Sequence, residues 1–331
     1  NMSTAQLDNS RVSKHLGQTS SYAREYDPSL LVREPRSSNR TYLGLESGSL
    51  PFCGYEPRQG NRTYLGLTGN NLPFCGYDIW NAYEISAMTE RGLPVTAIAK
   101  IMYPCDNDHI VESKSIKLYF NSFNMARLGT TGDECLDEVK ELAEKDLSEL
   151  LETNVVVTLF NPSHVERADV RPYFHKGYTT VEDDDEMMDG MNFTQYTETP
   201  EMLAGPYGIS QAGYLTLYQY HSSLLKSNCR VTNQPDWGDV YIHMKTDKAL
   251  TPNALARYIV SFRDECHFHE EICECIYKRL WDLFIPKELA VTCLYARRGG
   301  IDINPTRVSH VDLLNDQLID PDIPFSKTPR Q

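Results

Sequence analysis

The 331-residue sequence lacks the features that define several large classes of protein. It has no run of about 18 apolar residues, so we predict no membrane-spanning helix. It has neither a Gly-x-Gly-x-x-Gly fingerprint after a strand nor a Gly-x-x-x-x-Gly-Lys-Ser/Thr phosphate loop, so the common nucleotide-binding motifs are absent. Its first residues do not follow the basic, apolar and small-residue order of a secretory signal, and we therefore expect a cytoplasmic protein.

Positive charge and paired cysteines are scarce as well. The chain has 46 acidic and 32 basic residues, which gives a net charge of −14. A protein of this charge repels phosphate backbones, so we expect no direct nucleic-acid partner. Its nine cysteines are odd in number and irregularly spaced, which indicates free thiols rather than a disulfide framework. Hydrophobic residues make up 40% of the chain, a composition typical of a globular protein.

The first 80 residues contain a near-identical repeat. Residues 39–55 read NRTYLGLESGSLPFCGY, and residues 61–77 read NRTYLGLTGNNLPFCGY, with a period of 22 residues. Solenoid folds need about three or more copies to bury a shared face, so two copies indicate a local duplication. Because this region is rich in Ser, Gly, Asn, Arg and Pro, we interpret residues 1–80 as an N-terminal arm.

A weaker repeat organises the rest of the chain. Residues 117–123 read KLYFNSF and residues 257–262 read RYIVSF, so that three residue types recur 139 positions later. The recurring residues are Tyr119, Ser122 and Phe123 in the first copy, and Tyr258, Ser261 and Phe262 in the second.

Each copy of this repeat lies among similar strand and helix patterns. Alternating or β-rich segments predict strands at 95–103, 155–160, 239–245 and 289–295. Apolar residues spaced by three and four predict helices at 134–152 and 268–284. The fold class is therefore predicted as α+β, with two tandem modules at 81–204 and 205–331. Each would carry an antiparallel sheet with helices on one face.

One cysteine stands apart from the others. Cys229 lies in a polar loop that closes at Pro235, seven residues before Asp236. A buried structural cysteine usually lies in an apolar strand or helix, whereas one in a polar loop is a candidate nucleophile. Asp236 would supply its proton partner if the fold brings the two together. The alternative is that Cys229 contributes only packing.

The start of the second predicted helix carries a further candidate site. His269 and Glu270 lie where unpaired backbone N–H groups favour anions, and they could orient a ligand or move protons. One alternative is a helix start stabilised by acidic residues. Another is a zinc site, because Cys266, His269 and Cys273 are spaced for one helix face and Cys275 is close by.

Two basic segments are candidate anion sites. In residues 112–117 (ESKSIK) polar residues alternate as on a strand, which would place Lys114 and Lys117 on opposite faces. A solvated edge strand is the alternative. Residues 297–300 (RRGG) follow the last predicted strand, and Arg298 with Gly299 could bind an anion through the guanidinium and free backbone.

Four segments taken together resemble one known family. They are residues 112–124 (ESKSIKLYFNSFN), 227–238 (SNCRVTNQPDWG), 261–271 (SFRDECHFHEE) and 297–305 (RRGGIDINP). They resemble the NADPH-dependent nitrile reductases that convert 7-cyano-7-deazaguanine to 7-aminomethyl-7-deazaguanine, in the biosynthesis of the tRNA nucleoside queuosine. The resemblance is to the long, two-module branch and extends from about residue 35 to residue 305. It implies a tunnelling fold, a homodimer and NADPH as cofactor.

The resemblance also implies a role for individual residues. Cys229 matches the nucleophile, which attacks the nitrile carbon to give a covalent thioimide, and Asp236 matches the general acid. The residues that match substrate contacts are Val111, Glu112, Ser113, His269 and Glu270. Those that match NADPH contacts are Ser113, Lys114, Arg298 and Gly299, and Lys117 is a further candidate.

The roles divide between the two modules. Residues 86–90 (SAMTE) occupy the place of Cys229 in the first module and contain no cysteine. The first module keeps the predicted ESKS strand, whereas the second keeps Cys229, Asp236, His269 and Glu270. We therefore expect the site to lie between the modules. The alternative function is a non-catalytic purine- or pterin-binding protein with the same tunnelling fold.

Overall fold

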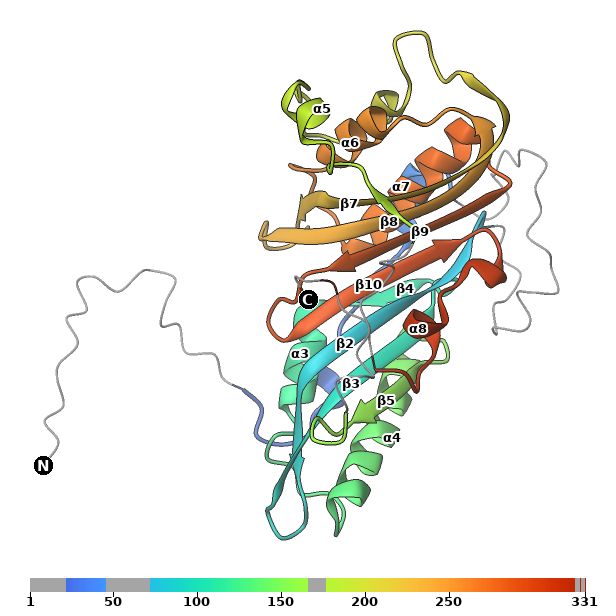
Figure 1. The fold of residues 1–331 in the computed structure, drawn as a ribbon. Helices are drawn as coiled ribbons and strands as arrows, with labels where there is room; N and C mark the ends of the chain where they lie inside the picture. The colour runs from blue at the N-terminus through green and yellow to red at the C-terminus, as the bar shows by residue number, and fades with distance from the viewer. Residues whose placement is uncertain (1–21, 46–71, 166–176, 325–327, 329–330) are drawn as a thin grey trace, which may run out of the picture.

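The computed structural model describes residues 22–45, 72–165 and 177–324, together with Thr328 and Gln331. Its main feature is one eight-stranded sheet, with the strand order β5-β3-β2-β10-β9-β8-β7-β6 (Figure 1). Neighbouring strands are antiparallel, except that the two-residue β6 runs parallel to β7. A separate small sheet pairs β1 with β4. The strands are β1 (Arg33–Pro35), β2 (Cys75–Met88), β3 (Pro94–Pro104), β4 (His109–Val111), β5 (Val156–Phe160), β6 (Thr179–Thr180), β7 (Gln211–Asn228), β8 (Pro235–Lys248), β9 (Glu288–Tyr295) and β10 (Ile301–Val308).

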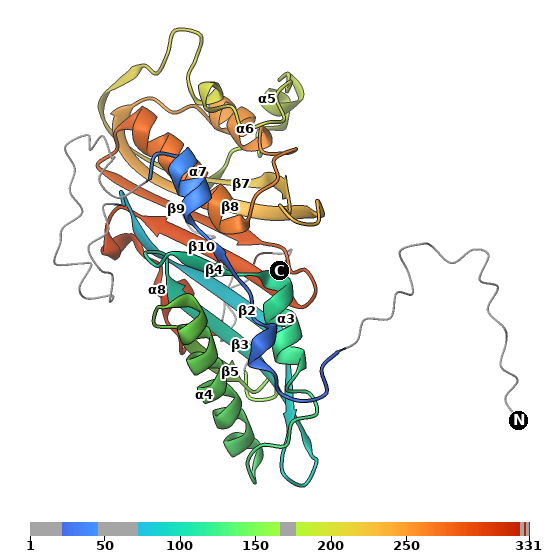
Figure 2. The same ribbon diagram turned by 180° about the vertical axis from the view of Figure 1, so that it is seen from behind.

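The longer helices cover one face of the sheet, and the short α8 lies on the opposite face (Figures 1 and 2). The helices are α1 (Ser37–Tyr42), α3 (Ser113–Asn121), α4 (Gly132–Leu151), α5 (Asp185–Asp189), α6 (Pro252–Val260), α7 (His269–Phe284) and α8 (Asp316–Ile319). Single 3-10 turns are at Pro28–Leu30, Pro200–Leu203 and Val311–Leu313. Within the described residues, no helix is both long and apolar enough to cross a bilayer.

The internal repeat predicted from the sequence is a structural repeat. Each half has a hairpin, a short helix, a long helix and a strand, in the orders β2-β3-α3-α4-β5 and β7-β8-α6-α7-β9. The predicted strands correspond to β3, β5, β8 and β9, and the predicted helices correspond to α4 and α7. The α+β class, with an antiparallel sheet and helices on one face, is therefore confirmed.

Each half has its own apolar core between sheet and helices. In the first half α3 and α4 pack on β2 and β3, and in the second α6 and α7 pack on β8 and β9. The recurring residues of the repeat are the anchors of these cores: Tyr119, Phe123, Tyr258 and Phe262 are all fully buried. Burial of aromatic side chains at matching places explains why these residue types recur.

The prediction of a strand at residues 112–117 is wrong. Glu112 is instead the N-cap of α3, and its carboxylate accepts hydrogen bonds from two backbone N–H groups of the first helical turn. Ile116, Tyr119 and Phe120 then face the core at helical spacing. The polar alternation of ESKS arises because the exposed first turn of a helix is rich in polar residues, not because the segment is extended.

The segment after β9 also differs from the prediction. Residues 297–300 do not follow the last strand; they form the turn into β10, which the sequence analysis missed. β10 pairs with β2 from Ile301 to Val308 and thereby joins the two halves into one continuous sheet. Because β2 begins at Cys75, the expected boundary between residues 1–80 and 81–204 falls inside this strand.

Parts of both copies of the N-terminal duplication lie among the described residues. From the first copy, residues 39–45 include part of α1 and place Leu43 and Leu45 in the core of the second half. From the second copy, residues 72–77 place Leu72 and Phe74 in the same core and lead into β2. The rest of the duplication, residues 46–71, lies outside the described part of the chain.

A buried network of charges ties the N-terminal arm to both halves. Arg36 Nη2 lies 2.6 Å from Asp78 Oδ2, and Arg307 Nη1 lies 2.9 Å from Asp78 Oδ1. Arg40 Nη2 and Arg307 Nε both contact Glu274 Oε1, at 2.6 and 3.2 Å. Because an unpaired buried charge is strongly destabilising, this network fixes the arm against β2, β10 and α7.

Candidate active site

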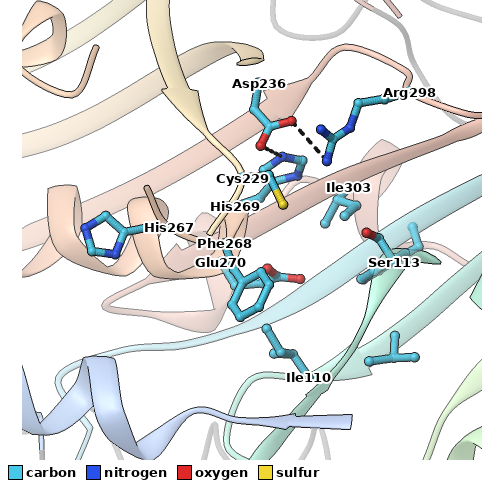
Figure 3. A pocket seen from close by; sticks show the side chains of 12 residues that line it. Ile110, Ser113, Cys229, Asp236, His267, Phe268, His269, Glu270, Arg298 and Ile303 are labelled. Atoms are coloured by element: carbon cyan, nitrogen blue, oxygen red, sulfur yellow. Dashed lines mark ion pairs between the residues drawn. The ribbon is translucent and has the colours of Figure 1, made fainter. Parts of the chain in front are cut away.

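A pocket lies where the two halves meet (Figure 3). The first half contributes Trp80, Ile110, Val111 and Ser113 to its lining. The second half contributes Cys229, Asp236, His267, Phe268, His269, Glu270, Arg298 and Ile303. Seven of the predicted site residues therefore line one pocket, and residues of both halves take part in it. That this pocket is the functional site stays a prediction.

The turn between β7 and β8 positions Cys229. Its backbone N–H donates to Gln234 O at 2.8 Å, and Asn233 N–H donates back to Cys229 O at 3.0 Å. Asn233 adopts a left-handed conformation, with φ of 55°, which asparagine tolerates better than most residues. These contacts hold the half-buried thiol at the edge of the pocket.

The surroundings of this thiol favour its anionic form. Burial alone would raise the pKa of Cys229, but hydrogen bonds from Thr232, Val231 and Arg298 outweigh it, and the pKa falls below its ordinary value. Backbone N–H groups of a turn that converge in this way form a small anion-binding concavity. Since the thiolate is the nucleophilic form of cysteine, the lowered pKa favours the form that a nucleophile needs.

Asp236 lies between two basic side chains at the start of β8. Its Oδ2 is 3.2 Å from His269 Nε2, and its Oδ1 is 3.4 Å from Arg298 Nη2 (Figure 3). Arg298 also donates from Nη1 to Gln234 Oε1 at 2.9 Å. With only 5% of its surface exposed, Asp236 is held in one place by these partners.

An aromatic ring orients His269. The imidazole stacks on the ring of Tyr295, with centroids 3.8 Å apart and planes 5° from parallel. Gly238 makes room for this ring, because a Cβ at that position would lie 3.2 Å from Tyr295 Cδ1. Tyr295 and Gly238 thus place the histidine beside Asp236.

Glu270 is a buried carboxyl with one unused oxygen. It is the second residue of α7, only 3% of its surface is exposed, and Oε1 has no hydrogen-bond partner among the described residues. Burial, reinforced by the negative charge of Asp78, raises the pKa of Glu270 to about 8. A buried polar atom without a partner is costly, and it marks a position where a ligand can bind.

Glu112 does not line the pocket. Its Oε1 accepts from Lys114 N at 2.9 Å and its Oε2 accepts from Ser115 N at 2.7 Å, as the cap of α3. The strand face on which it was predicted does not exist. Ser113, the first residue of the helix, is the member of this segment that reaches the pocket, next to Val111.

Basic side chains gather near the turn between β9 and β10. Gly299 has a φ of 61°, and a Cβ there would lie 3.2 Å from Lys117 Nζ, so α3 of the first half approaches this turn of the second half. Lys114 is exposed on the first turn of α3, and the side chain of Arg298 is 36% exposed. Together these residues offer positive charge beside the pocket.

The alternative of a zinc site is not supported. The thiol of Cys266 donates to Asn233 Oδ1 at 3.5 Å, whereas those of Cys273 and Cys275 are buried against other partners. Cys266 also lies before α7 rather than on it. In the part of the chain that the structure describes, no group of three or more His, Cys, Asp and Glu side chains is arranged to hold a metal ion.

The sequence analysis missed five lining residues: Trp80, Ile110, His267, Phe268 and Ile303. Trp80 and Ile303 are direct neighbours across the β2–β10 pairing, which was not predicted. His267 and Phe268 immediately precede His269, so their proximity to the site could have been inferred once α7 was placed.

Comparisons with known proteins agree on one family. Residues 55–159 match the family model described as "Nitrile reductase, 7-cyano-7-deazaguanine-reductase N-term", and residues 235–312 match the one described as "QueF-like protein". A solved structure of the archaeosine synthase QueF-Like in the apo form aligns with a TM-score of only 0.25 and 16% identity. It covers 28% of this chain and 91% of the other.

Curated relatives are similar over nearly the whole chain. A protein of Colwellia psychrerythraea is 36% identical over 96% of this chain and 95% of its own length. A protein of Hahella chejuensis is 37% identical over 89% of this chain and 93% of its own, and one of Acidovorax ebreus is 36% identical over 89% and 92%. Each of the three is named NADPH-dependent 7-cyano-7-deazaguanine reductase.

Proposed function

This chain belongs to the family of NADPH-dependent 7-cyano-7-deazaguanine reductases, and we propose that it reduces the nitrile of that base to a primary amine in queuosine biosynthesis. It is an oxidoreductase that depends on NADPH. The observation that carries the proposal is the thiol of Cys229, whose pKa is lowered and which lines one pocket with Asp236 and Glu270.

Covalent catalysis by Cys229 is the first proposed step. The thiolate adds to the nitrile carbon, a C–S bond forms, and one π-electron pair of the C≡N bond moves to nitrogen. The nitrogen takes a proton from Asp236, which gives a neutral thioimide. Because Asp236 Oδ2 is 3.2 Å from His269 Nε2, the pair can share the proton before it is delivered.

When bound, NADPH supplies hydride, and two equivalents with two protons convert the nitrile to the amine and return Cys229 as thiolate. The chain's own residues fit such a cofactor without a phosphate loop. Lys114 and Arg298 offer exposed cations for phosphate groups, and Gly299 allows close backbone approach where a side chain would meet Lys117. Ser113, the first residue of α3, lines the pocket, and its hydroxyl would donate a hydrogen bond to a phosphate oxygen.

We assign the base to the side of the pocket formed by α7 and β4. Glu270 Oε1, which has no protein partner, would accept a ring N–H of the deazaguanine, and His269 would bound the other end of the site. Val111 and Ser113 would close the pocket from the first half. Glu112 remains a proposed substrate residue, through the first turn of α3 that its carboxylate holds in place.

We also propose the larger organisation that family membership suggests. The two halves would form a tunnelling fold that associates as a homodimer, with an arm that ends where β2 begins at Cys75, a first module up to residue 204 and a second at 205–331. The substrate is a small molecule, and we expect no direct contact with nucleic acid. The alternative of a purine- or pterin-binding protein without turnover keeps the same fold and differs only in the chemistry at Cys229.

Oxidation of NADPH in the presence of 7-cyano-7-deazaguanine tests the proposed function. We expect two molecules of NADPH oxidised per molecule of amine formed, and we expect Cys229→Ala to abolish the reaction. Cys266→Ala is the matched control, because this exposed thiol lies outside the pocket lining. Binding of the base without any oxidation of NADPH would instead establish the non-catalytic alternative.

A further inference from the structure

Trp80 carries a buried hydrogen-bond donor that the proposed mechanism does not use. It lies in the middle of β2, its surface is only 1% exposed, and it lines the pocket. Its Nε1 is buried and has no hydrogen-bond partner among the described residues. The indole N–H is the only polar group of this side chain, and leaving it buried without a partner is unfavourable. A ligand that accepts this hydrogen bond would remove the cost.

An unused acceptor accompanies this unused donor in the same pocket. Glu270 Oε1 also lacks a partner, and both residues line the pocket. Asp78 precedes Trp80 by two residues and therefore points to the same face of β2, and its charge contributes to the raised pKa of Glu270. The pocket thus has an unused acceptor on α7 and an unused donor on β2.

Ile303 completes this side of the pocket. It is the direct cross-strand neighbour of Trp80 on β10, and it also lines the pocket. An apolar neighbour on this side cannot satisfy the indole N–H. Since no described residue accepts this hydrogen bond, the donor can pair with a bound molecule.

We propose that the indole N–H of Trp80 donates a hydrogen bond to the ring carbonyl oxygen of the substrate while Glu270 accepts the adjacent ring N–H. The inference rests on the proposed function and names a specificity residue for the same site. A guanine-like lactam presents an acceptor beside a donor, which complements this pair. An adenine-like edge presents an amino group where the carbonyl would be, so it would leave the indole N–H unpaired and bind weakly.

The test changes each partner of the proposed hydrogen bond, the ligand by exchange of oxygen for sulfur and the protein by Trp80→Phe. Calorimetric titration on a Cys229→Ala background would compare 7-cyano-7-deazaguanine with its thiocarbonyl analogue, which keeps both ring N–H groups but accepts hydrogen bonds weakly. We expect the oxygen-to-sulfur exchange to weaken binding about tenfold in the parent and less than about threefold in Trp80→Phe. Trp80→Phe should also bind the carbonyl compound about tenfold more weakly.

Trp281→Phe is the matched control. Trp281 is another buried tryptophan, stacked on Tyr277 in α7, and it does not line the pocket. It should behave like the parent toward both ligands. An equal oxygen-to-sulfur ratio in the parent and in Trp80→Phe would overturn the assignment of Trp80 while leaving the proposed function intact. Failure of the parent to bind the carbonyl compound would overturn both.

A second measurement serves if Trp80→Phe does not fold. The chain has three tryptophans, so nitrogen-15 labelling gives three indole N–H signals, which Trp237→Phe and Trp281→Phe assign by elimination. The Trp80 signal should move downfield with the carbonyl ligand and by less with the thiocarbonyl ligand. A Trp80 signal that responds equally to both ligands would contradict the hydrogen bond.

Discussion

The two halves of the molecule build the same hairpin and use it differently. In the first half, Met88 ends β2 and forms a single backbone bridge with Arg127. In the second, Asn228 ends β7 and forms the same kind of parallel bridge with Cys266. The ends of the two hairpins are therefore equivalent positions of one scaffold.

The residue that follows this bridge shows the difference. In the first half it is Thr89, whose N–H donates to Leu93 O across four positions and whose hydroxyl accepts from Leu93 N. In the second half it is Cys229, whose N–H donates to Gln234 O across five positions. In the longer turn, backbone N–H groups donate to the Cys229 thiol. In the shorter turn, the Thr89 hydroxyl accepts a hydrogen bond from the backbone of the turn itself. The turn of the second half is one residue longer, and it carries a cysteine where the first half has a threonine.

The first turns of the two long helices differ in the same way. Asp133 and Glu270 are both second residues of their helices, α4 and α7. Asp133 is exposed, where an acid at a helix N-terminus only stabilises the helix. Glu270 is buried against the other half, where its protonation is altered. Both positions carry an acid, and burial distinguishes the one in α7.

The largest effect is expected from Asp236→Asn. Asp236 is the second residue of β8, and its counterpart in β3 is Val95, so the acid is absent from the first half. Loss of a positioned acid should lower the rate of NADPH oxidation by about 10²–10⁴-fold. Asp247→Asn, an exposed site at the far end of β8, should leave the rate unchanged. A near-native rate for Asp236→Asn would remove Asp236 from the chemistry.

The next largest effect is a pH dependence of the free energy of unfolding, which Glu270 should cause and Asp133 should not. Because the pKa of Glu270 is raised to about 8, the folded protein keeps a proton that the unfolded chain releases above its ordinary pKa. The contribution of Glu270 to the free energy of unfolding should therefore fall as the pH rises from about 4.5 to about 8. Each pKa unit corresponds to about 1.4 kcal/mol, so this contribution should change by a few kcal/mol over the interval.

Urea unfolding at a series of pH values measures this contribution. Glu270→Gln should lose stability less steeply with rising pH than the native protein over this interval. Asp133→Asn should follow the native curve, because that carboxyl is exposed. Parallel curves for native protein and Glu270→Gln would show that Glu270 ionises normally.

A smaller effect is expected from the caps of the two short helices. Glu112 caps α3 and Thr251 caps α6, each through hydrogen bonds to the backbone of the first turn. Glu112→Leu and Thr251→Ala should each lower the free energy of unfolding by about 1 kcal/mol. Only Glu112→Leu should also weaken binding of the nitrile, by about ten- to a hundredfold, since its helix borders the pocket.

Calorimetry of both cap variants on a Cys229→Ala background makes this comparison. Unchanged affinity in Glu112→Leu would separate the capped first turn of α3 from substrate binding. Equal losses of affinity in both variants would mean that the effect comes from stability alone.

The smallest effect should follow removal of one copy of the duplication. Deleting residues 46–67 joins Leu45 of the first copy to Thr68 of the second and leaves one complete block. The buried residues of both copies, such as Leu43 and Phe74, are retained. Loop length has a weak entropic cost, so the free energy of unfolding should change by less than about 1 kcal/mol. A large fall in melting temperature would show that both full copies contribute to stability.

Much of the fold could be predicted because its signals are local. The spacing of buried residues along α4 and α7 and the alternation along β3 and β8 are properties of short segments. The start of α3 was not predicted, although the 139-residue internal repeat contains a signal for it. Its counterpart α6 begins with Thr251 followed by Pro252, a strong helix-start signal that could have been transferred across the 139-residue period.

Other features depend on partners far apart in the sequence. β10 contains Pro305, which argues against a strand, yet its pairing with β9 covers only Thr306 to Val308. The contact of Arg36 with Asp78, and of Asp78 with Arg307, joins three distant segments, and no local pattern signals it. The orientation of Glu112 and the approach of Trp80 to the pocket likewise follow from tertiary packing.

The most direct test of the account is the intact mass of the protein after incubation with 7-cyano-7-deazaguanine in the absence of NADPH. If Cys229 adds to the nitrile, the mass should rise by that of one substrate molecule, and Thr89→Ala and Cys266→Ala should show the same increase. Cys229→Ala should show none. An unchanged mass of the native protein under saturating substrate would contradict covalent catalysis at Cys229.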